Sequence, residues 1–263
     1  MVRMRDGSAG DADYGVIART YTDHRKPEPR IAALLHAALG GARTVLNVGA
    51  GAGSYEPSDR DVTPVEPSAS MRARRPAHLP AAVDATAESL PFPDGSFDAA
   101  MTTFSVHQWS GLSRGLAEVR RVTTGPVAVL TCDPALVRDF WLYEYCPKVL
   151  DTEASRYPAP SALAEGLGGT TTVTRVPIPL DCSDGFNEAY YGRPEALLDP
   201  GARQACSAWS FVDEAAHSRF HEDLSRDLRD GTWDARHGHL RALPELRGSL
   251  VLVVSTPDGP NGP

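Results

Sequence analysis

The chain carries the sequence TVLNVGAGAG at residues 44–53, where five residues of strand character run directly into three closely spaced glycines. Glycine adopts backbone conformations that other residues avoid, so such a turn lets the main chain approach a ligand with no side chain in the way. Thirteen residues after Gly53, Glu66 ends a second strand-like stretch, DVTPVE at residues 61–66. A carboxylate at the tip of the next strand is where a nucleoside ribose presents its two hydroxyls. The segment therefore predicts the nucleoside-binding half of a sheet.

The spacing of these glycines limits the class of nucleotide. A dinucleotide fingerprint reads G-x-G-x-x-G, whereas this chain reads G-x-G-x-G and has Ser54 at the sixth position. No Lys-Ser or Lys-Thr pair follows the glycines, which excludes a phosphate-binding P-loop.

Composition narrows the choice of partner and compartment. The 263 residues are 41% apolar, enough for one large α/β domain with a substantial insertion. The net charge is −8 and the longest basic cluster is RARR at residues 72–75, which we interpret as a solvated helix face. This balance argues against a nucleic-acid partner. The N-terminus has no apolar signal segment, no stretch reaches transmembrane length, and the four cysteines lack metal spacing, so we expect a cytoplasmic protein without membrane contact.

The pattern beyond the glycines alternates between strands and helices. Strands are expected at residues 44–48, 62–66, 81–83, 97–104, 126–132, 171–176 and 249–255, and helices at residues 14–25, 31–39, 68–74 and 111–121. This alternation predicts an α/β fold with a doubly wound, mostly parallel seven-stranded sheet.

The alternation breaks after Asp133, and residues 181–245 predict a helical insertion before the last strand. We therefore expect four segments: an N-terminal helical lid at 1–26, a core at 27–180, the substrate-side insertion at 181–245, and the last strand with a flexible tail at 246–263.

Several separated blocks resemble the class I S-adenosylmethionine-dependent methyltransferases, in the small-molecule branch called type 11. They are LNVGAGAG at 46–53, VEPS at 65–68 with Met71, AESLPFPDGSFD at 87–98 and GLAEVRRV at 115–122. The resemblance spans about residues 14–133. It implies a Rossmann-like sheet whose last strand is antiparallel, S-adenosylmethionine as methyl donor, S-adenosylhomocysteine as product, and no metal. The implied activity is methyl transfer to a small molecule, aromatic or natural-product in character.

The resemblance also implies which residues hold the donor. The glycine backbone would meet the amino-acid and ribose parts, Glu66 the ribose hydroxyls, and Ala87 and Glu88 the adenine edge. Asn47 stands where the family usually has Asp. The full set is Tyr21, Arg25, Gly49, Ala50, Gly51, Gly53, Glu66, Pro67, Met71, Thr86, Ala87, Glu88, Thr103, Phe104 and Ser105.

Arg25 and Tyr21 lie one helical turn apart, so Arg25 is a candidate partner for the donor carboxylate and Tyr21 a cover for the sulfonium. The alternative is a surface helix whose aromatic residues face the core.

His107 follows the fourth predicted strand and is the candidate catalytic residue. Ligands of open α/β sheets sit beyond the carboxyl ends of the strands, and an imidazole there can take a proton from an incoming OH, NH or acidic CH. The alternative is a histidine that only stabilises its loop or lines the adenine pocket.

Aromatic and acidic residues, most of them in the second half, predict the acceptor site. A flat, partly apolar acceptor suits such a cluster, and ordinary helix packing is the alternative. The candidates are Tyr14, Trp109, Trp141, Tyr145, Asp184, Phe186, Tyr190 and Tyr191. His237 and His239 have no third ligand at metal spacing, so no zinc is expected.

Two other functions on the same fold remain alternatives. One is an enzyme that uses bound S-adenosylmethionine for cyclisation or isomerisation, and the other is a non-catalytic protein that binds it. The sequence leaves open whether O, N or C is methylated and whether the protein is a monomer or a homodimer.

Overall fold

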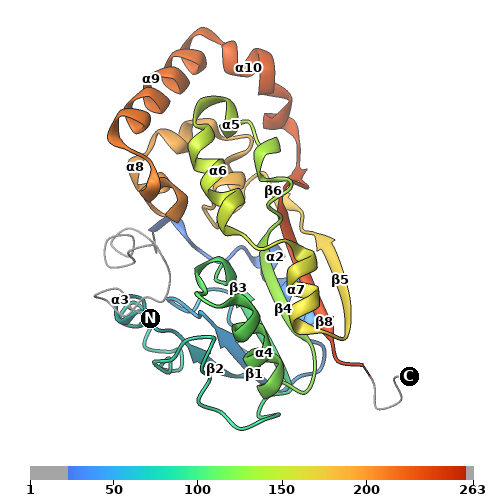
Figure 1. Cartoon of the computed structure of the whole chain (residues 1–263). Helices are drawn as coiled ribbons and strands as arrows, with labels where there is room; N and C mark the ends of the chain where they lie inside the picture. The colour runs from blue at the N-terminus through green and yellow to red at the C-terminus, as the bar shows by residue number, and fades with distance from the viewer. Residues whose placement is uncertain (1–22, 259–263) are drawn as a thin grey trace.

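In the computed structural model, which describes residues 23–258, the core is a six-stranded sheet of order β2-β1-β3-β4-β8-β5 (Figure 1). Strands β1 to β4 are parallel, and β8 runs antiparallel between β4 and β5, as expected for the last strand. The strands are β1 (Thr44–Val48), β2 (Asp61–Val65), β3 (Ala99–Thr103), β4 (Val127–Cys132), β5 (Thr170–Arg175) and β8 (Leu250–Thr256).

The seventh strand, expected at residues 81–83, is reduced to a single parallel bridge between Val65 and Val83. Val83 N donates to Pro64 O at 2.9 Å, and Glu66 N donates to Val83 O at 3.0 Å. Ala85 N also donates to Val83 O, at 3.0 Å, so the chain turns away after one pair. The doubly wound fold is confirmed, with six strands in place of seven.

Two of the predicted core helices form close to their expected bounds. Helix α2 (Pro29–Ala38) begins two residues before the expected Ile31, because Glu28 caps it and Pro29 fits the first turn. Helix α4 (Leu112–Val122) matches its expected range. The third, α3 (Ala69–Arg72), forms only one turn after its Ser68 cap. The helix expected at 14–25 falls almost entirely outside the described residues.

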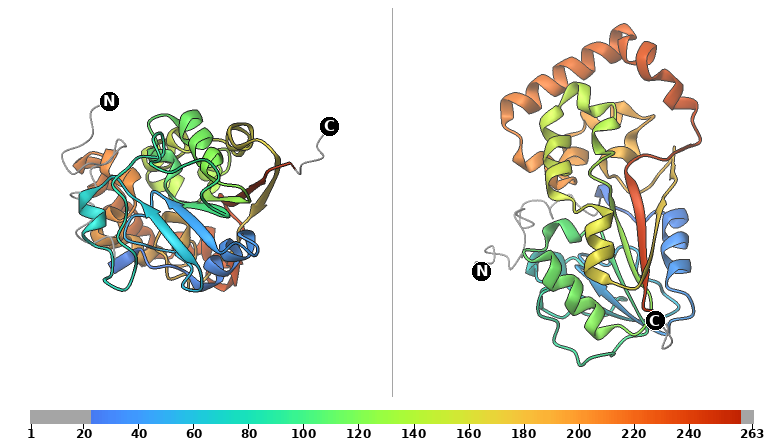
Figure 2. Two further views of the ribbon diagram at one scale, coloured as in Figure 1. Left: turned by 90° about the horizontal axis from the view of Figure 1, so that it is seen from below. Right: turned by 45° about the vertical axis from the view of Figure 1, so that its right-hand side comes forward.

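Helices cover both faces of the sheet (Figure 2). On one face, α2 packs Ile31 and Leu35 against Val45 of β1 and Leu130 of β4. On the other face, α4 and α7 (Pro160–Leu167) pack against residues such as Leu46 of β1. Neighbouring residues of β1 thus enter opposite layers, as strand periodicity requires.

A helical lobe, residues 136–157 and 178–246, stands above the sheet at the carboxyl ends of β3 and β4 (Figure 1). It contains α5 (Leu142–Tyr145), α6 (Pro147–Arg156), α8 (Pro200–Gln204), α9 (Glu214–Asp230), α10 (Thr232–His237) and the short pair β6 (Ile178–Pro179) and β7 (Glu245–Leu246). Residues 136–157 were expected in the core, but Trp141 packs its ring on Trp233 at 5.6 Å between centroids. No helix in the described range 23–258 is long and apolar enough to cross a membrane.

Candidate active site

The glycine turn folds over the end of the neighbouring strand. Gly49 N and Ala50 N both donate to Val65 O at 2.9 Å. Gly49, Gly51 and Gly53 have φ angles of +69°, +52° and +95°, in the region that favours glycine. A Cβ on Gly49 would lie 1.8 Å from Ser105 Oγ. The turn therefore depends on glycine, and it brings the predicted residues of β1 against Ser105 beyond β3.

Glu66 reaches the same turn from β2. Its Oε2 accepts a hydrogen bond from Gly51 N at 2.8 Å, and its Oε1 accepts one from Ser68 N at 2.8 Å. A Cβ on Gly51 would lie 3.3 Å from Met71 Cε. The structure thus gathers the glycine turn, the carboxylate and Met71, which the sequence predicted as one donor-binding group.

A buried ion pair contacts the turn through Arg75, which donates to the carbonyl of Gly51. Arg75 Nη2 lies 2.8 Å from Glu56 Oε2, with side chains only 4% and 2% exposed. Glu56 Oε1 also accepts from Asn47 Nδ2 at 3.0 Å. Arg72 donates to the carbonyls of Glu66 and Pro67 at 2.8 and 2.9 Å. The interpretation of residues 72–75 as a solvated face is therefore wrong for Arg75 and Arg72, because both reach back to the donor loops.

Glu88 fixes the loop that leads into α4. Its Oε1 accepts from Ser110 Oγ at 2.7 Å and from Gly111 N at 2.9 Å. Burial works to raise the pKa of this carboxyl, but these hydrogen bonds leave it lowered. Trp109, predicted on the substrate side, donates from Nε1 to Ser105 Oγ at 3.0 Å and packs over Gly115. Trp109 therefore lies beside the donor residues, and a Cβ on Gly115 would also touch Ala87.

A second site lies beyond β3, where the chain turns sharply. Phe104 has a φ of +49°. This left-handed conformation costs a residue with a side chain about 1–2 kcal/mol. His107 follows in the short helix Val106–Gln108. A cavity of about 30 Å³ lies here, lined by Arg25, Phe104, His107, Glu153, Arg156, Tyr157, Phe186, Ala205, Cys206 and Ser207. The cavity joins the predicted Arg25, Phe104, His107 and Phe186 to residues that the sequence did not indicate.

His107 is held by ring packing in this cavity. Its ring meets that of Tyr157 edge-on, with 4.6 Å between centroids. Its Nδ1 is buried and has no hydrogen-bond partner among residues 23–258. Burial, followed by the guanidinium groups of Arg156 and Arg25, holds the pKa of His107 well below its ordinary value. The imidazole is therefore neutral at physiological pH.

Glu153 of α6 is the residue that sequence reasoning missed. Its Oε1 accepts a hydrogen bond from Asn187 Nδ2 at 2.7 Å, and Asn187 Oδ1 accepts from Trp209 Nε1 at 3.0 Å. Burial raises the pKa of Glu153 to about 7, against the opposing effect of the Asn187 hydrogen bond. An acid on a mixed-polarity helix looks like an ordinary surface residue, so no local signal marked it.

Arg25 and Asp184 pair with each other. Arg25 Nε lies 2.5 Å from Asp184 Oδ1, and Tyr55 Oη donates to Asp184 Oδ2 at 2.8 Å. The Arg25 guanidinium also lies 4.8 Å from the centre of the Phe104 ring. Arg25 was predicted to meet the donor carboxylate and Asp184 to orient the acceptor. In this structure Arg25 and Asp184 form one group with Tyr55, which follows the glycine turn, and this group connects the turn with the lobe.

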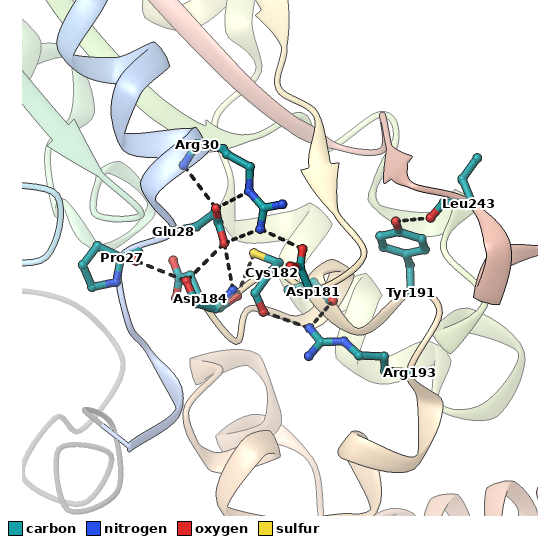
Figure 3. Close-up of polar contacts among 11 residues, drawn as sticks. Pro27, Glu28, Arg30, Asp181, Cys182, Asp184, Tyr191, Arg193 and Leu243 are labelled. Atoms are coloured by element: carbon teal, nitrogen blue, oxygen red, sulfur yellow. Dashed lines mark hydrogen bonds and ion pairs between the residues drawn. The ribbon is translucent and has the colours of Figure 1, made fainter.

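Residues around this pair form an N-terminal clamp, residues 25–30 against 181–184 (Figure 3). Glu28 Oε2 accepts from Ser183 N at 3.0 Å, and Arg30 Nη2 donates to Asp181 Oδ1 at 2.8 Å. Burial opposes the ionisation of Glu28, but its hydrogen bonds with Arg30 and Ser183 lower the pKa to about 2. The start of the insertion is thereby fastened to the segment that leads into the core.

The other predicted acceptor residues do not line this cavity. Trp141 and Tyr191 line a separate cavity of about 520 Å³ in the lobe, and Trp141 Nε1 donates to Tyr191 O at 3.0 Å. Tyr145 Oη donates to Asp227 Oδ2 at 2.9 Å, and Tyr190 is buried against Gly185. The contacts named for these residues lie within the lobe. Tyr14 and Tyr21 lie outside the described residues.

The two histidines near the C-terminus do not form a metal centre. Within residues 23–258, no group of three or more His, Cys, Asp or Glu side chains could hold a metal ion. His237 pairs instead with Glu144, 3.3 Å from its Oε1.

Comparisons with known proteins agree with this fold. A family model described as a methyltransferase domain, of type 11, matches residues 46–125. A search of curated protein sequences finds no significant match. A crystal structure from Anabaena variabilis, assigned as a methyltransferase from an antibiotic biosynthesis pathway, aligns with a TM-score of 0.81 and 27% identity over 88% of this chain and 98% of that one.

More distant structures share the fold. The cyclase SpnF aligns with a TM-score of 0.53 and 16% identity over 94% of this chain and 95% of that one. Geranyl diphosphate C-methyltransferase from Streptomyces coelicolor aligns with a TM-score of 0.51 and 15% identity over 88% of this chain and 77% of that one.

The positive-φ glycines of the turn leave a main-chain surface that a side chain would fill, and Glu66 sets a carboxylate beside it. These residues fit the ribose and amino-acid parts of S-adenosylmethionine. They agree with the domain matched at residues 46–125 and with the Anabaena structure, which support a class I S-adenosylmethionine-dependent methyltransferase of the type 11 branch.

Proposed function

We propose that this enzyme methylates a small-molecule acceptor whose reacting group enters the cavity around His107 and Glu153. The observation that carries this proposal is the placement of two sites at one edge of the sheet. The glycine turn and Glu66 lie at the ends of β1 and β2, and the cavity lies at the end of β3 under the lobe. Ser105 links them, because it lies against Gly49 of the turn and directly follows Phe104, which lines the cavity.

Different residues would hold the donor and position the acceptor. S-adenosylmethionine, when bound, supplies an electrophilic methyl group. The backbone of residues 49–53, Glu66 and Met71 would hold it, and the lobe would exclude water from the reacting groups. Alignment of two reactants alone can lower a barrier by about 7–11 kcal/mol, so few reactive side chains are required.

The walls of the cavity indicate the kind of acceptor. The rings of Phe104, Tyr157 and Phe186 supply apolar surface, while Glu153 and His107 supply polar atoms. Such a mixture suits an aromatic or otherwise partly apolar compound with one polar reacting group. The assignment of the Anabaena protein to an antibiotic pathway supports a role for this chain in specialised metabolism.

The test is an acceptor screen. The purified enzyme is incubated with S-adenosylmethionine and simple probes, beginning with catechol, phenol and benzylamine and extending to a natural-product library. Release of S-adenosylhomocysteine together with a mass gain of one methyl group is the expected result. Conversion of a probe without that mass gain would favour the cyclisation or isomerisation alternative. Donor binding without conversion of any compound would count against the proposal. The Glu66→Ala variant serves as the negative control.

A further inference from the structure

Two titratable side chains from different parts of the fold line the small cavity, and this inference rests on the proposed function. His107 comes from the loop after β3, and Glu153 comes from α6 in the lobe. The sequence indicated only His107 as a candidate base. The surroundings of the His107 and Glu153 side chains differ in how they affect the gain of a proton.

His107 is poorly placed to receive a proton. Arg25 and Arg156 line the same cavity, so an imidazolium would become a third cation in a buried space. A further positive charge beside two guanidinium groups in a buried space is unfavourable. Its Nδ1, which has no partner among residues 23–258, is instead suited to a hydrogen bond with a bound group.

Glu153, in contrast to His107, lies where the gain of a proton is favourable. Asn187 holds its Oε1, and Trp209 fixes the orientation of that amide. Its Oε2 makes no hydrogen bond within the described part of the chain, and the Glu153 residue lines the cavity. Protonation would remove a buried charge rather than create one. The charged and titratable groups around it are Arg25, His107, Cys132, Arg156, Tyr157, Glu188 and Cys206.

The cavity also limits the group that can enter. Its volume is about 30 Å³. A single water needs about 10–15 Å³, so the cavity holds only a few water-sized groups. A hydroxyl or an amine fits, while the rest of the acceptor remains outside.

We propose that Glu153 is the catalytic base of this enzyme and that His107 stays neutral and orients the acceptor through Nδ1. The acceptor carries an exchangeable proton on oxygen or nitrogen. As a lone pair of that atom forms the new bond to the methyl carbon, the carbon–sulfur bond of the donor breaks and its electrons stay on sulfur. The O–H or N–H proton passes to Glu153 Oε2, and the carboxylate becomes a neutral carboxylic acid.

The first experiment does not depend on the acceptor. Infrared spectra of the wild type and of Glu153→Gln are recorded across pH 5–9, and their difference isolates the carboxyl group of Glu153. A conversion with its midpoint between about pH 6 and 8 supports the proposal, because a general base works best near the operating pH. A midpoint below about pH 5 would overturn it.

The second experiment uses the probe methylated most rapidly in the acceptor screen. Glu153→Gln should lower the single-turnover rate by about 10²–10⁴-fold and abolish the loss of rate toward low pH. Its affinity for S-adenosylhomocysteine should stay within about twofold, measured by calorimetry. His107→Gln should lower the rate less and keep the acid limb of the pH profile. An acid limb that disappears in His107→Gln and persists in Glu153→Gln would assign the base to His107 instead.

Glu188 offers a matched control. It is a buried glutamate whose pKa burial also raises to about 7, but both of its oxygens accept from Ser249 N at 2.9 Å. Glu188→Gln should therefore keep both the acid limb and a rate within about threefold of the wild type. If no probe is methylated, the proposed function fails and the infrared titration alone decides on Glu153. If Glu153→Gln turns over at the wild-type rate, the role of Glu153 fails while the methyltransferase function stands.

Discussion

Tyr55 donates a hydrogen bond from Oη to Asp184 Oδ2 at 2.8 Å, across 129 positions of sequence. Tyr55 follows the glycine turn, and Asp184 begins the insertion. Tyr55 has a φ of +66°, which is uncommon for a residue with a side chain. The contact is buried, and Asp184 also binds Arg25 of the cavity wall. The side of the glycine turn and the wall of the cavity are thus joined through one carboxylate.

Removal of the Asp184 charge should destabilise the fold. Asp184→Asn keeps the shape but leaves Arg25 with its charge buried, and breaking such a pair costs about 3–5 kcal/mol. Urea unfolding measures this loss. Asp181→Asn is the control, because the Asp181 side chain is 79% exposed. Its pair with Arg30 is screened by solvent and contributes little to stability. Equal losses for the two variants would show that the buried contacts of Asp184 contribute no more to the free energy of unfolding than an exposed ion pair does.

Glu66→Gln should weaken binding of S-adenosylhomocysteine by roughly ten- to a hundredfold. Hydrogen bonds to a charged acceptor contribute about 1.5–3 kcal/mol each. Gln also loses one acceptor for the N–H groups of Gly51 and Ser68. Calorimetry provides the measurement. Glu165→Gln, at an exposed position of α7, should bind like the wild type. Unchanged affinity in Glu66→Gln would remove Glu66 from the donor site.

Gly49→Ala should lose both stability and donor binding, since the new Cβ would collide with Ser105 Oγ. Gly40→Ala is the matched control, because Gly40 also has a positive φ, +58°, but nothing lies within 4 Å of an added Cβ. The control should lose about 1–2 kcal/mol of unfolding free energy from backbone strain alone and keep its affinity. Adding Ser105→Gly should restore part of the stability of Gly49→Ala. A Gly49→Ala variant no worse than Gly40→Ala would contradict the close approach.

Glu28 should make the protein sensitive to acid. Its pKa in the folded state is lowered to about 2, below the ordinary value of 4.5, so the unfolded chain binds its proton more readily. The stability that Glu28 contributes is therefore present above about pH 4.5 and is lost as the pH falls toward 2. Glu28→Gln should be less stable than the wild type at pH 7, and the difference should shrink toward pH 3. Thermal unfolding across this range measures it, and a difference independent of pH would be evidence against the ionised state of Glu28.

The glycine turn and the placement of Glu66 beside it could be predicted because their signals are local. Residues 44–53 encode a buried strand and a turn that only glycine tolerates, and Glu66 sits at a fixed distance along the chain. Strand β4 reads as a continuous apolar run because both of its faces are covered. The apolar run at residues 250–254 likewise predicted strand β8, whereas its antiparallel direction was implied by the family resemblance.

The sequence by itself therefore determined the fold class, the donor loop and the position of His107 after β3. Only the tertiary structure decided that Glu153 lines the same cavity as His107, that Arg25 pairs with Asp184 across 159 positions, and that Arg75 is buried against the glycine turn. It also placed Trp141 and Tyr191 in a different cavity from His107. The physical reason is that backbone conformation and hydrophobic period depend on adjacent residues, whereas the burial and pairing of a charge depend on which distant elements pack around it.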